Sequence, residues 1–208
     1  MNIVAEDDGL GFATLGMRSE DGHEICARVD DPRLVGPCRD FVRYVADYIE
    51  QGNPIVAGQT LAYGYWIAKA VSEHSGRLCF WERSPGGGDY VPGITNLLRY
   101  WSEQQTTCQH AGARFTPHSG QQMIVVSDGV MEGDVVQGVR YPSPPHMSGW
   151  WLTTDRYGGN TASLRVVHAH HVTAGRPDLV RFLALDYGYR FYSDDGEVRF
   201  DEKVAADE

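Results

Sequence analysis

Three histidines close together, His168, His170 and His171, are the most suggestive chemical cluster in the sequence. On a strand the first two would share a face, and a His-x-His pair of this kind can hold one metal ion. The candidates for a third ligand are His146, Glu132 and Asp134. Two ligands do not make a site, however, and histidines on an exposed strand often form plain polar surface. A metal-dependent enzyme is therefore the alternative hypothesis, and no metal or other cofactor is expected.

No arrangement in the sequence is typical of nucleophilic or acid–base catalysis. Ser127, Ser148 and the four cysteines could act as nucleophiles, with histidines as their bases. A nucleophile elbow requires glycine two residues before the serine, and His146 stands in that place before Ser148. The acidic pair at 194–195 is followed by glycine and is typical of a turn. The sequence therefore predicts no catalytic residues and a protein that is not an enzyme.

Aromatic, arginine and histidine side chains gather around a proline-rich loop, residues 142–147. Tryptophan, tyrosine and arginine dominate the binding energy of many protein interfaces, and a proline-restricted loop loses less entropy on capture. Trp150 and Trp151 must point to opposite faces of a strand, so one can fill a core while the other is accessible. The residues predicted to contact a protein partner are Arg140, Tyr141, His146, Trp151, Arg156 and Tyr157.

Charge and hydropathy limit the classes of partner. The net charge of −10 argues against nucleic acid, whose phosphates require a basic surface. Residues 193–208 carry seven acids against Arg199 and Lys203, which either steers a basic protein partner or only keeps the chain in solution. No run of eighteen apolar residues is present, so no membrane span is expected. Residues 1–9 lack the basic and apolar regions of a signal peptide, which predicts a cytoplasmic protein.

The four cysteines, Cys26, Cys38, Cys79 and Cys108, include no closely spaced pair. Zinc ribbons use Cys-x2-Cys pairs, and none is present. In a reducing compartment such cysteines are most simply small buried apolar side chains. We therefore expect buried thiols without a zinc ribbon.

The first part of the chain should contain two hairpins and two helices. Short strands at 11–16 and 23–29 flank a turn at 19–22, and a second strand pair occupies 59–83. Apolar residues at helical spacing from Cys38 to Ile49 predict one helix, which starts at Asp31-Pro32 or Gly36-Pro37 and stops at Gly52. A second helix is predicted from Thr95 to about Gly112. The polar segment 112–121, with proline and glycine, is the best candidate boundary. We expect an α+β domain at 1–118 and a second one at 119–208.

Beyond this boundary the pattern becomes rich in strands. Strands are predicted at 123–127, 135–141, 148–154, 163–171, 187–192 and 198–200. A short helix should begin at Arg176-Pro177-Asp178, with proline and an acid in its first turn. The expected fold class for the chain is α+β, mainly antiparallel sheets with a few packed helices, as one continuous domain or two.

Five motifs follow one another in this second part of the chain. They are Val125-Val-Ser-Asp-Gly-Val130, Gly138-Val-Arg-Tyr141, Ser148-Gly-Trp-Trp151, Arg176-Pro-Asp-Leu179 and Tyr187-Gly-Tyr-Arg-Phe191. As an ordered set they resemble a bacterial immunity-protein domain of polymorphic toxin systems, once catalogued as a domain of unknown function. The resemblance covers roughly residues 121–200, under half of the chain, and Ser-Gly-Trp is its most specific piece.

The resemblance implies a small α+β domain that binds and neutralises a cognate toxin without catalysing a reaction. It transfers Ser148, Gly149 and Trp150 as signature positions, for which a structural role is expected. Relatives often carry an acidic residue before Ser-Gly-Trp, whereas Met147 stands there in this chain. That difference bears on which partner is bound. The resemblance does not extend to residues 1–118.

Overall fold

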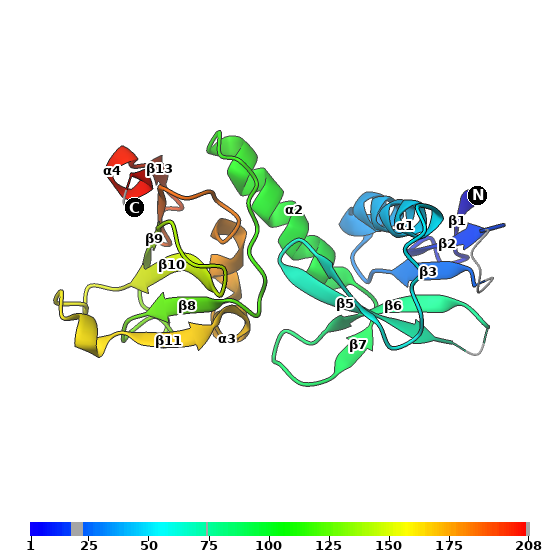
Figure 1. The fold of residues 1–208 in the computed structure, drawn as a ribbon, viewed down its shortest axis with the longest axis horizontal. Coiled ribbons are helices and arrows are strands. Elements are labelled where there is room, and N and C mark those ends of the chain that lie inside the picture. The colour runs from blue at the N-terminus through cyan, green and yellow to red at the C-terminus, as the bar shows by residue number, and fades with distance from the viewer. Residues whose placement is uncertain (18–22, 74, 207–208) are drawn as a thin grey trace. The chain divides into compact units, whose positions relative to one another are not determined.

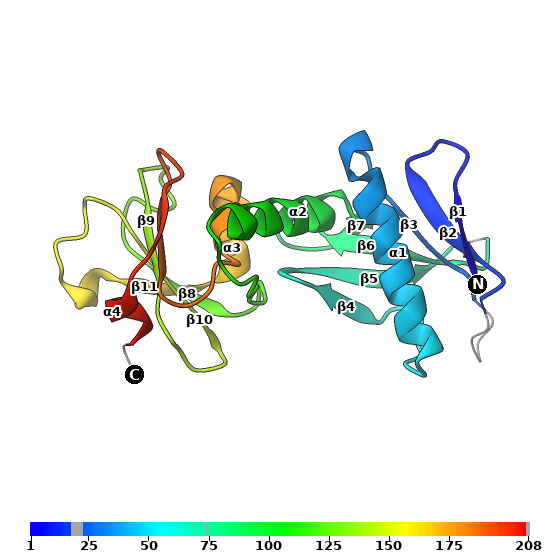
Figure 2. The ribbon, with the colours of Figure 1, turned by 90° about the horizontal axis from the view of Figure 1, so that it is seen from above.

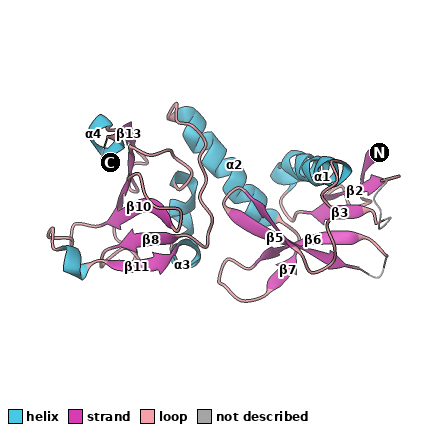
Figure 3. Ribbon diagram, in the orientation of Figure 1, coloured by secondary structure: helices cyan, strands magenta, loops and turns pink. Residues whose placement is uncertain are grey.

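The computed structural model describes residues 1–17, 23–73 and 75–206, which form two units (Figure 1). Unit 1 is Met1–Ser84 with Gly88–Ser102, and unit 2 is Pro85–Gly87 with Glu103–Glu208. Each unit holds one sheet with helices, and most strand pairs are antiparallel (Figure 3). The predicted α+β class is therefore confirmed.

The sheet of unit 1 has the order β1-β2-β3-β6-β5-β4, with β7 also paired to β6. Its strands are β1 (Asn2–Ala5), β2 (Gly11–Leu15), β3 (Ile25–Arg28), β4 (Thr60–Tyr63), β5 (Trp66–Ser72), β6 (Leu78–Arg83) and β7 (Tyr90–Pro92). All neighbours are antiparallel except β3 and β6, which run parallel. This one parallel pair joins β1-β2-β3 to the remaining strands.

Helix α1 (Val35–Glu50) packs its apolar side on this sheet and follows a short turn of helix, η1 (Pro32–Leu34). Seen from above, α1 crosses the strands (Figure 2). The predicted apolar stripe is buried, and Phe41 meets Phe80 of β6 edge to face at 5.3 Å between ring centroids. The spacing of apolar residues thus predicted both the helix and its buried side.

Helix α2 (Thr95–His110) begins in unit 1 and ends in unit 2. The buried carboxylate of Glu82 accepts hydrogen bonds from the backbone N–H groups of Asn96 and Leu97. These N–H groups have no partner within the helix, so a carboxylate at this end stabilises it. The helix ends near Gly112, as predicted.

The predicted boundary at 118/119 differs from the division into units at 102/103, which falls within α2. The intervening proline- and glycine-containing segment belongs to unit 2. Its Thr116 N–H donates to the carbonyl of Ala184, and the Gly120 carbonyl accepts from the His170 N–H. The segment is therefore anchored in unit 2 rather than acting as a linker.

The sheet of unit 2 has the order β11-β8-β10-β9-β12-β13. Its strands are β8 (Met123–Val126), β9 (Gln137–Arg140), β10 (Met147–Thr153), β11 (Arg165–His168), β12 (Tyr189–Tyr192) and β13 (Val198–Phe200). β8 and β10 are parallel, and the other pairs are antiparallel. In Figure 1 the strands β11, β8 and β10 lie side by side.

The core of unit 2 lies on one face of this sheet. Phe191 of β12 stacks on Phe182 at 4.2 Å and meets Trp150 at 5.3 Å between centroids. Phe182 ends the 3-10 helix η3 (Pro177–Phe182), which follows α3 (Ala169–Gly175). Two further short helices are η2 (Thr161–Ser163) and α4 (Glu202–Ala205).

Several predicted elements differ from the observed ones. The expected strand 163–171 ends at His168, and α3 begins at Ala169, so His170 and His171 are helical. The segment 59–83 contains three strands rather than two, and β1 and α4 were not predicted. The predicted turn at 19–22 lies outside the described residues.

The prediction that all four cysteines are simple buried thiols is wrong for two of them. Cys26 and Cys79 form a disulfide, whereas Cys38 and Cys108 are buried free thiols. Burial raises the pKa of Cys38 to about 12 and that of Cys108 to about 11. The sequence could not indicate the pairing, because 53 positions separate the bonded cysteines. In the part of the chain that the structure describes, no helix has both the length and the apolar character to cross a membrane.

Candidate binding surface

One row of directly paired residues crosses all six strands of the unit 2 sheet. In sheet order they are Val166, Val125, Trp151, Val139, Arg190 and Arg199. Residues paired in register share a face, so these side chains lie on the face opposite Trp150. Trp150 is fully buried, whereas Trp151 is half-buried. The two tryptophans therefore point to opposite faces of β10, as predicted.

A second paired row, Gln137, Thr153 and Tyr192, continues the same face two residues further along. Tyr141, which directly follows β9, lies at the end of this face away from Gln137. Its ring meets that of Trp151 edge to face at 6.0 Å between centroids. We call this set the open sheet face: Val125, Gln137, Val139, Tyr141, Trp151, Thr153, Arg190 and Tyr192. Val125 and Val139 are 6% and 8% exposed, and the remaining members are half-buried. The face therefore presents aromatic and polar edges around an apolar centre.

A groove of about 680 Å³ extends from one end of the open sheet face. Gln137, Thr153 and Tyr192 form its sheet side, and Asp134, Val135, Thr154, Asp155 and Arg156 complete it. Within it the Arg156 guanidinium forms an ion pair with Asp134 at 2.6 Å. A groove of this size can receive a partner's side chains, and it offers them carboxylates.

Exposed acids collect at this end of the sheet because of its topology. β8, β10 and β12 all run in the same direction, so their carboxyl ends meet at one edge. The exposed acids that follow these strands are Asp128, Asp155, Asp194 and Asp195. The edge is therefore negatively charged next to the groove, apart from the ion-paired Arg156 and Arg165.

The segment Ser148-Gly149-Trp150 builds an irregular step in β10. The Ser148 hydroxyl donates to the Met123 carbonyl and accepts from the Trp150 N–H. Gly149 has φ +83°, and an added Cβ would lie 2.2 Å from the Tyr141 carbonyl oxygen. The indole N–H of Trp150 donates to the Leu183 carbonyl at 3.1 Å. Ser148, Gly149 and Trp150 are all buried, and the Ser148 and Trp150 side chains are both hydrogen-bonded within the fold.

Arg140, expected among the contact residues, lies in the interior and is 2% exposed. Its guanidinium donates to the carbonyls of Ser148, Thr116 and Leu185. Burial lowers the pKa of this guanidinium. The reason for its position is alternation, since Arg140 pairs with Trp150 on the core face and its neighbour Tyr141 points to the open sheet face.

The remaining predicted contact residues lie at two ends of the open sheet face. His146 is exposed in the proline loop, where the Gln122 amide donates to the carbonyls of Pro145 and Met147. Arg156 is exposed in the groove, and Tyr157 is half-buried in the turn after it. The structure thus brings Tyr141 and Trp151 into contact, with His146 and Arg156–Tyr157 near opposite ends of the same strands.

Within the described residues, His168, His170 and His171 do not bring three potential metal-ligating atoms together. His168 and His170 stack at 5.4 Å between centroids, and their Nδ1 atoms hydrogen-bond the carbonyls of Gln121 and Gly120. Across the described ranges, one set of three potential metal-ligating atoms converges, and it belongs to Cys26, Glu73 and Cys79 in unit 1. Two of those atoms are bonded to each other in the disulfide.

Sequence reasoning missed six of the eight residues of the open sheet face: Val125, Gln137, Val139, Thr153, Arg190 and Tyr192. Each lies on a predicted strand, but its face depends on the register with neighbours far away in the chain. Alternation within 137–141 could have separated Arg140 from Val139 and Tyr141. No local signal indicates that β12 lies beside β9.

The second part of the chain is similar to a known protein family. Residues 103–204 match the model of the Imm33-like domain family, whose name denotes immunity proteins. The match supports an immunity-protein domain in this part of the chain, which coincides with unit 2 except for residues 85–87 and the last four residues. No curated protein and no solved structure matches the chain significantly.

Proposed function

We propose that this protein is an immunity protein that binds a cognate bacterial toxin and neutralises it by covering part of its surface. The observation that carries the proposal is the overlap of two features. The Imm33-like match at 103–204 falls on the unit whose sheet has an aromatic, half-exposed face next to a groove. Such a protein acts by occlusion and needs no catalytic residues.

Trp151 is the proposed anchor of the contact, together with Tyr141. An anchor must present large apolar area and lose little rotamer entropy, and edge-to-face packing already orders both rings. His146, Arg156 and Tyr157 are the proposed contacts around them. Arg140 is left out of the contact set, because its guanidinium is already used by three backbone carbonyls.

The chemistry of the toxin surface follows from the acidic end of the sheet. Asp155 lines the groove, and the exposed Asp194 and Asp195 follow shortly after Tyr192, which also lines it. Complementary charge speeds association and selects among partners more than it adds affinity. The toxin surface proposed here is therefore basic, with an apolar recess for Trp151.

The test is binding of the toxin encoded beside this protein, measured by calorimetry with Trp151→Ala. Removing a central aromatic anchor costs about 2 kcal/mol or more, which is about a thirtyfold rise in Kd. The matched control is Tyr44→Ala, an exposed aromatic residue on α1 of unit 1, for which no change is expected. Circular dichroism must show both variants folded. Unchanged affinity for Trp151→Ala would remove the open sheet face from the contact, and absence of binding by the parent protein would remove the proposed function.

A further inference from the structure

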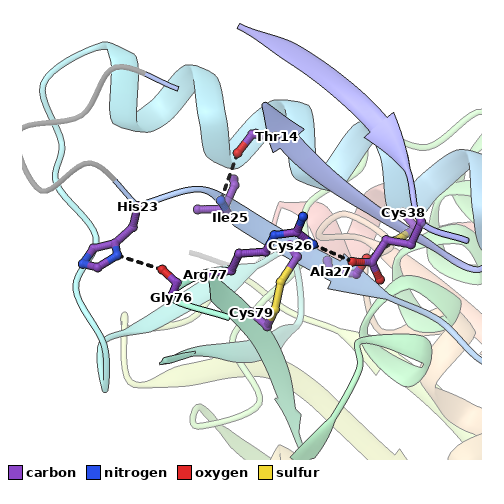
Figure 4. Close-up of a disulfide and its surroundings, with 10 residues drawn as sticks. Thr14, His23, Ile25, Cys26, Ala27, Cys38, Gly76, Arg77 and Cys79 are labelled. Carbon is purple, nitrogen blue, oxygen red and sulfur yellow. Dashed lines mark hydrogen bonds and ion pairs between the residues drawn. A yellow bond between two sulfur atoms is a disulfide. The ribbon is translucent and has the colours of Figure 1, made fainter. Parts of the chain in front are cut away.

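The disulfide of unit 1 lies where the two halves of its sheet meet. Cys26 of β3 and Cys79 of β6 are directly paired, with their Cα atoms 4.5 Å apart (Figure 4). Among the described residues, the ladder between these parallel strands has one other pair, Ile25 with Leu78. This short ladder and the disulfide join β1-β2-β3 to β6-β5-β4.

The disulfide faces away from helix α1. Phe80 packs on Phe41 of α1, so its strand neighbour Cys79 points to the other face of the sheet. Cys26 shares that face because it pairs with Cys79. Of the two, Cys26 is 3% exposed and Cys79 is half-buried. An incoming reagent therefore meets Cys79 first.

Both cysteines line a polar cavity of about 100 Å³. Its charged lining residues are Glu6, Arg28, Glu73 and Arg77. The Arg77 side chain forms an ion pair with Glu6 at 3.2 Å, and both residues line this cavity together with Cys26. A carboxylate oxygen of Glu73 lies within 4.8 Å of both sulfurs. The sulfurs thus lie against charged groups and a cavity with room for water, unlike a disulfide enclosed in an apolar core.

These surroundings suit thiol–disulfide exchange. Exchange proceeds through attack of a thiolate on one sulfur and departure of the other sulfur as a thiolate. A guanidinium near a leaving sulfur stabilises its negative charge, and Arg77 lines the same cavity as both cysteines. Exchange also requires access, which the cavity and the half-buried Cys79 provide.

We propose that the Cys26–Cys79 disulfide is a site of reversible exchange with small-molecule thiols, and that it links the integrity of the unit 1 sheet to the thiol redox state of the surroundings. The thiolate of the small thiol attacks Sγ of Cys79, the S–S bond breaks, and Cys26 leaves as a thiolate that takes a proton from solvent. A second small thiol attacks the mixed disulfide and releases Cys79 as a thiolate, which is then protonated. The two small thiols are thereby oxidised to their own disulfide, and the reverse reaction closes the Cys26–Cys79 bond.

The two free cysteines do not take part. Cys38 and Cys108 are 0% and 2% exposed, and burial raises the pKa of each thiol far above neutral pH. Because the thiolate is the reactive form, both should remain unlabelled in the folded protein. Because these two thiols stay unlabelled, opening of the Cys26–Cys79 bond can be followed without interference from them.

The experiment uses the full chain, folded and oxidised, exposed to reduced glutathione at several concentrations. Samples are trapped with an alkylating reagent at set times, and modified cysteines are located by mass spectrometry. The expected result is opening of Cys26–Cys79 at a rate proportional to glutathione concentration, with Cys38 and Cys108 unmodified until denaturant is added. Oxidised glutathione should then restore the bond, and the melting temperature of the reduced protein should be lower by several degrees.

Arg77→Gln supplies the second readout. It should slow opening several-fold, whereas Arg39→Gln, the same charge change on an exposed residue of α1, should leave the rate unchanged. An opening rate that does not depend on glutathione concentration would overturn the proposal, because unfolding would then limit access. So would failure of Cys26 and Cys79 to form a bond in oxidised glutathione. If Arg77→Gln does not fold, the concentration dependence of the parent protein decides alone.

Discussion

At the scale of single residues, the buried position of Arg140 indicates that this side chain supports the fold and does not contact a partner. A buried guanidinium that donates to three carbonyls leaves all three without this donor when it is removed. Each unsatisfied buried polar group costs about 1–3 kcal/mol. The carbonyls come from β10, from the segment before β8 and from the segment after η3, so one side chain holds three parts of unit 2 together.

We therefore predict that Arg140→Met lowers the free energy of unfolding by about 3 kcal/mol or more. Urea denaturation measures the loss. Arg165→Met is the matched control, since Arg165 is an exposed arginine of the same sheet and should change stability by less than about 1 kcal/mol. A stable Arg140→Met protein with weakened toxin binding would mean that Arg140 contacts the partner after all.

His118 is a second buried residue, and its burial should make the stability of the protein depend on pH. It is 4% exposed, and burial together with the nearby charge of Arg140 lowers its pKa to about 3 from the usual 6.5. The folded protein therefore keeps His118 neutral over a range in which the unfolded chain takes up a proton. Because the unfolded state binds more protons between pH 6.5 and 3, stability falls as the pH decreases through this window.

The predicted loss for His118 alone is about 2 kcal/mol between pH 7 and pH 5. Urea denaturation at the two pH values measures it. His118→Gln, which cannot titrate, should show a smaller difference between pH 7 and pH 5 than the parent protein. Equal pH dependence in both proteins would show that His118 does not carry the acid sensitivity.

At the scale of elements, the irregular step at Ser148-Gly149-Trp150 determines the backbone path of β10. The pairing of β10 with β8 shifts register between Met147 and Trp151, and Gly149 adopts φ +83° within that shift. A side chain there would meet both an unfavourable backbone conformation and the Tyr141 carbonyl oxygen. The segment Ser148-Gly149-Trp150 therefore holds a backbone path that brings Trp150 into the core and Trp151 onto the open sheet face.

We expect Gly149→Ala to destabilise unit 2 by more than about 2 kcal/mol, through strain at φ > 0 and the close approach to Tyr141. Thermal unfolding followed by near-ultraviolet circular dichroism reports the loss of tryptophan packing. Gly158→Ala is the control, because an added Cβ at Gly158 would have nothing within 4 Å. Equal melting temperatures for the two variants would contradict a structural role of the signature glycine.

Much of the element order could be predicted from the sequence, because helices and strands leave local periodic patterns. Helix α1 and the strands β8, β9 and β10 follow from such patterns. The start of α3 could not be predicted, since His168-Ala-His-His continues the pattern of a strand. Its turn into a helix is set by tertiary contacts, in which the N–H groups of Ala169 and His170 donate to the carbonyls of Gln122 and Gly120.

The candidate site could be predicted only where it depends on local pattern. Alternation along β10 indicates that Trp151 is accessible, but sheet register decides which residues surround it. Arg190 and Tyr192 come from a strand more than 35 positions later, and Cys26 pairs with Cys79 across 53 positions. A single sequence contains no local pattern that indicates which distant strands or cysteines pair.

At the scale of the whole molecule, the net charge of −10 has a local organisation that total charge does not reveal. In unit 2 the parallel direction of β8, β10 and β12 gathers exposed acids at one edge, beside the groove. Under the proposed function, acids placed there attract a basic toxin before contact, whereas acids elsewhere contribute mainly to solubility. The proposed function therefore predicts that equal changes in net charge have unequal effects on association.

Replacing Asp155, Asp194 and Asp195 by asparagine should slow association with the toxin by about tenfold at low ionic strength, with little change in the dissociation rate. Stopped-flow or surface-based kinetics measure both rates, and the difference from the parent protein should shrink as salt is added, because exposed charges are screened. The control neutralises three exposed acids on α1 of unit 1: Asp40, Asp47 and Glu50. If both triple variants slow association equally, steering depends on net charge alone and the acidic edge beside the groove has no special part in recognition.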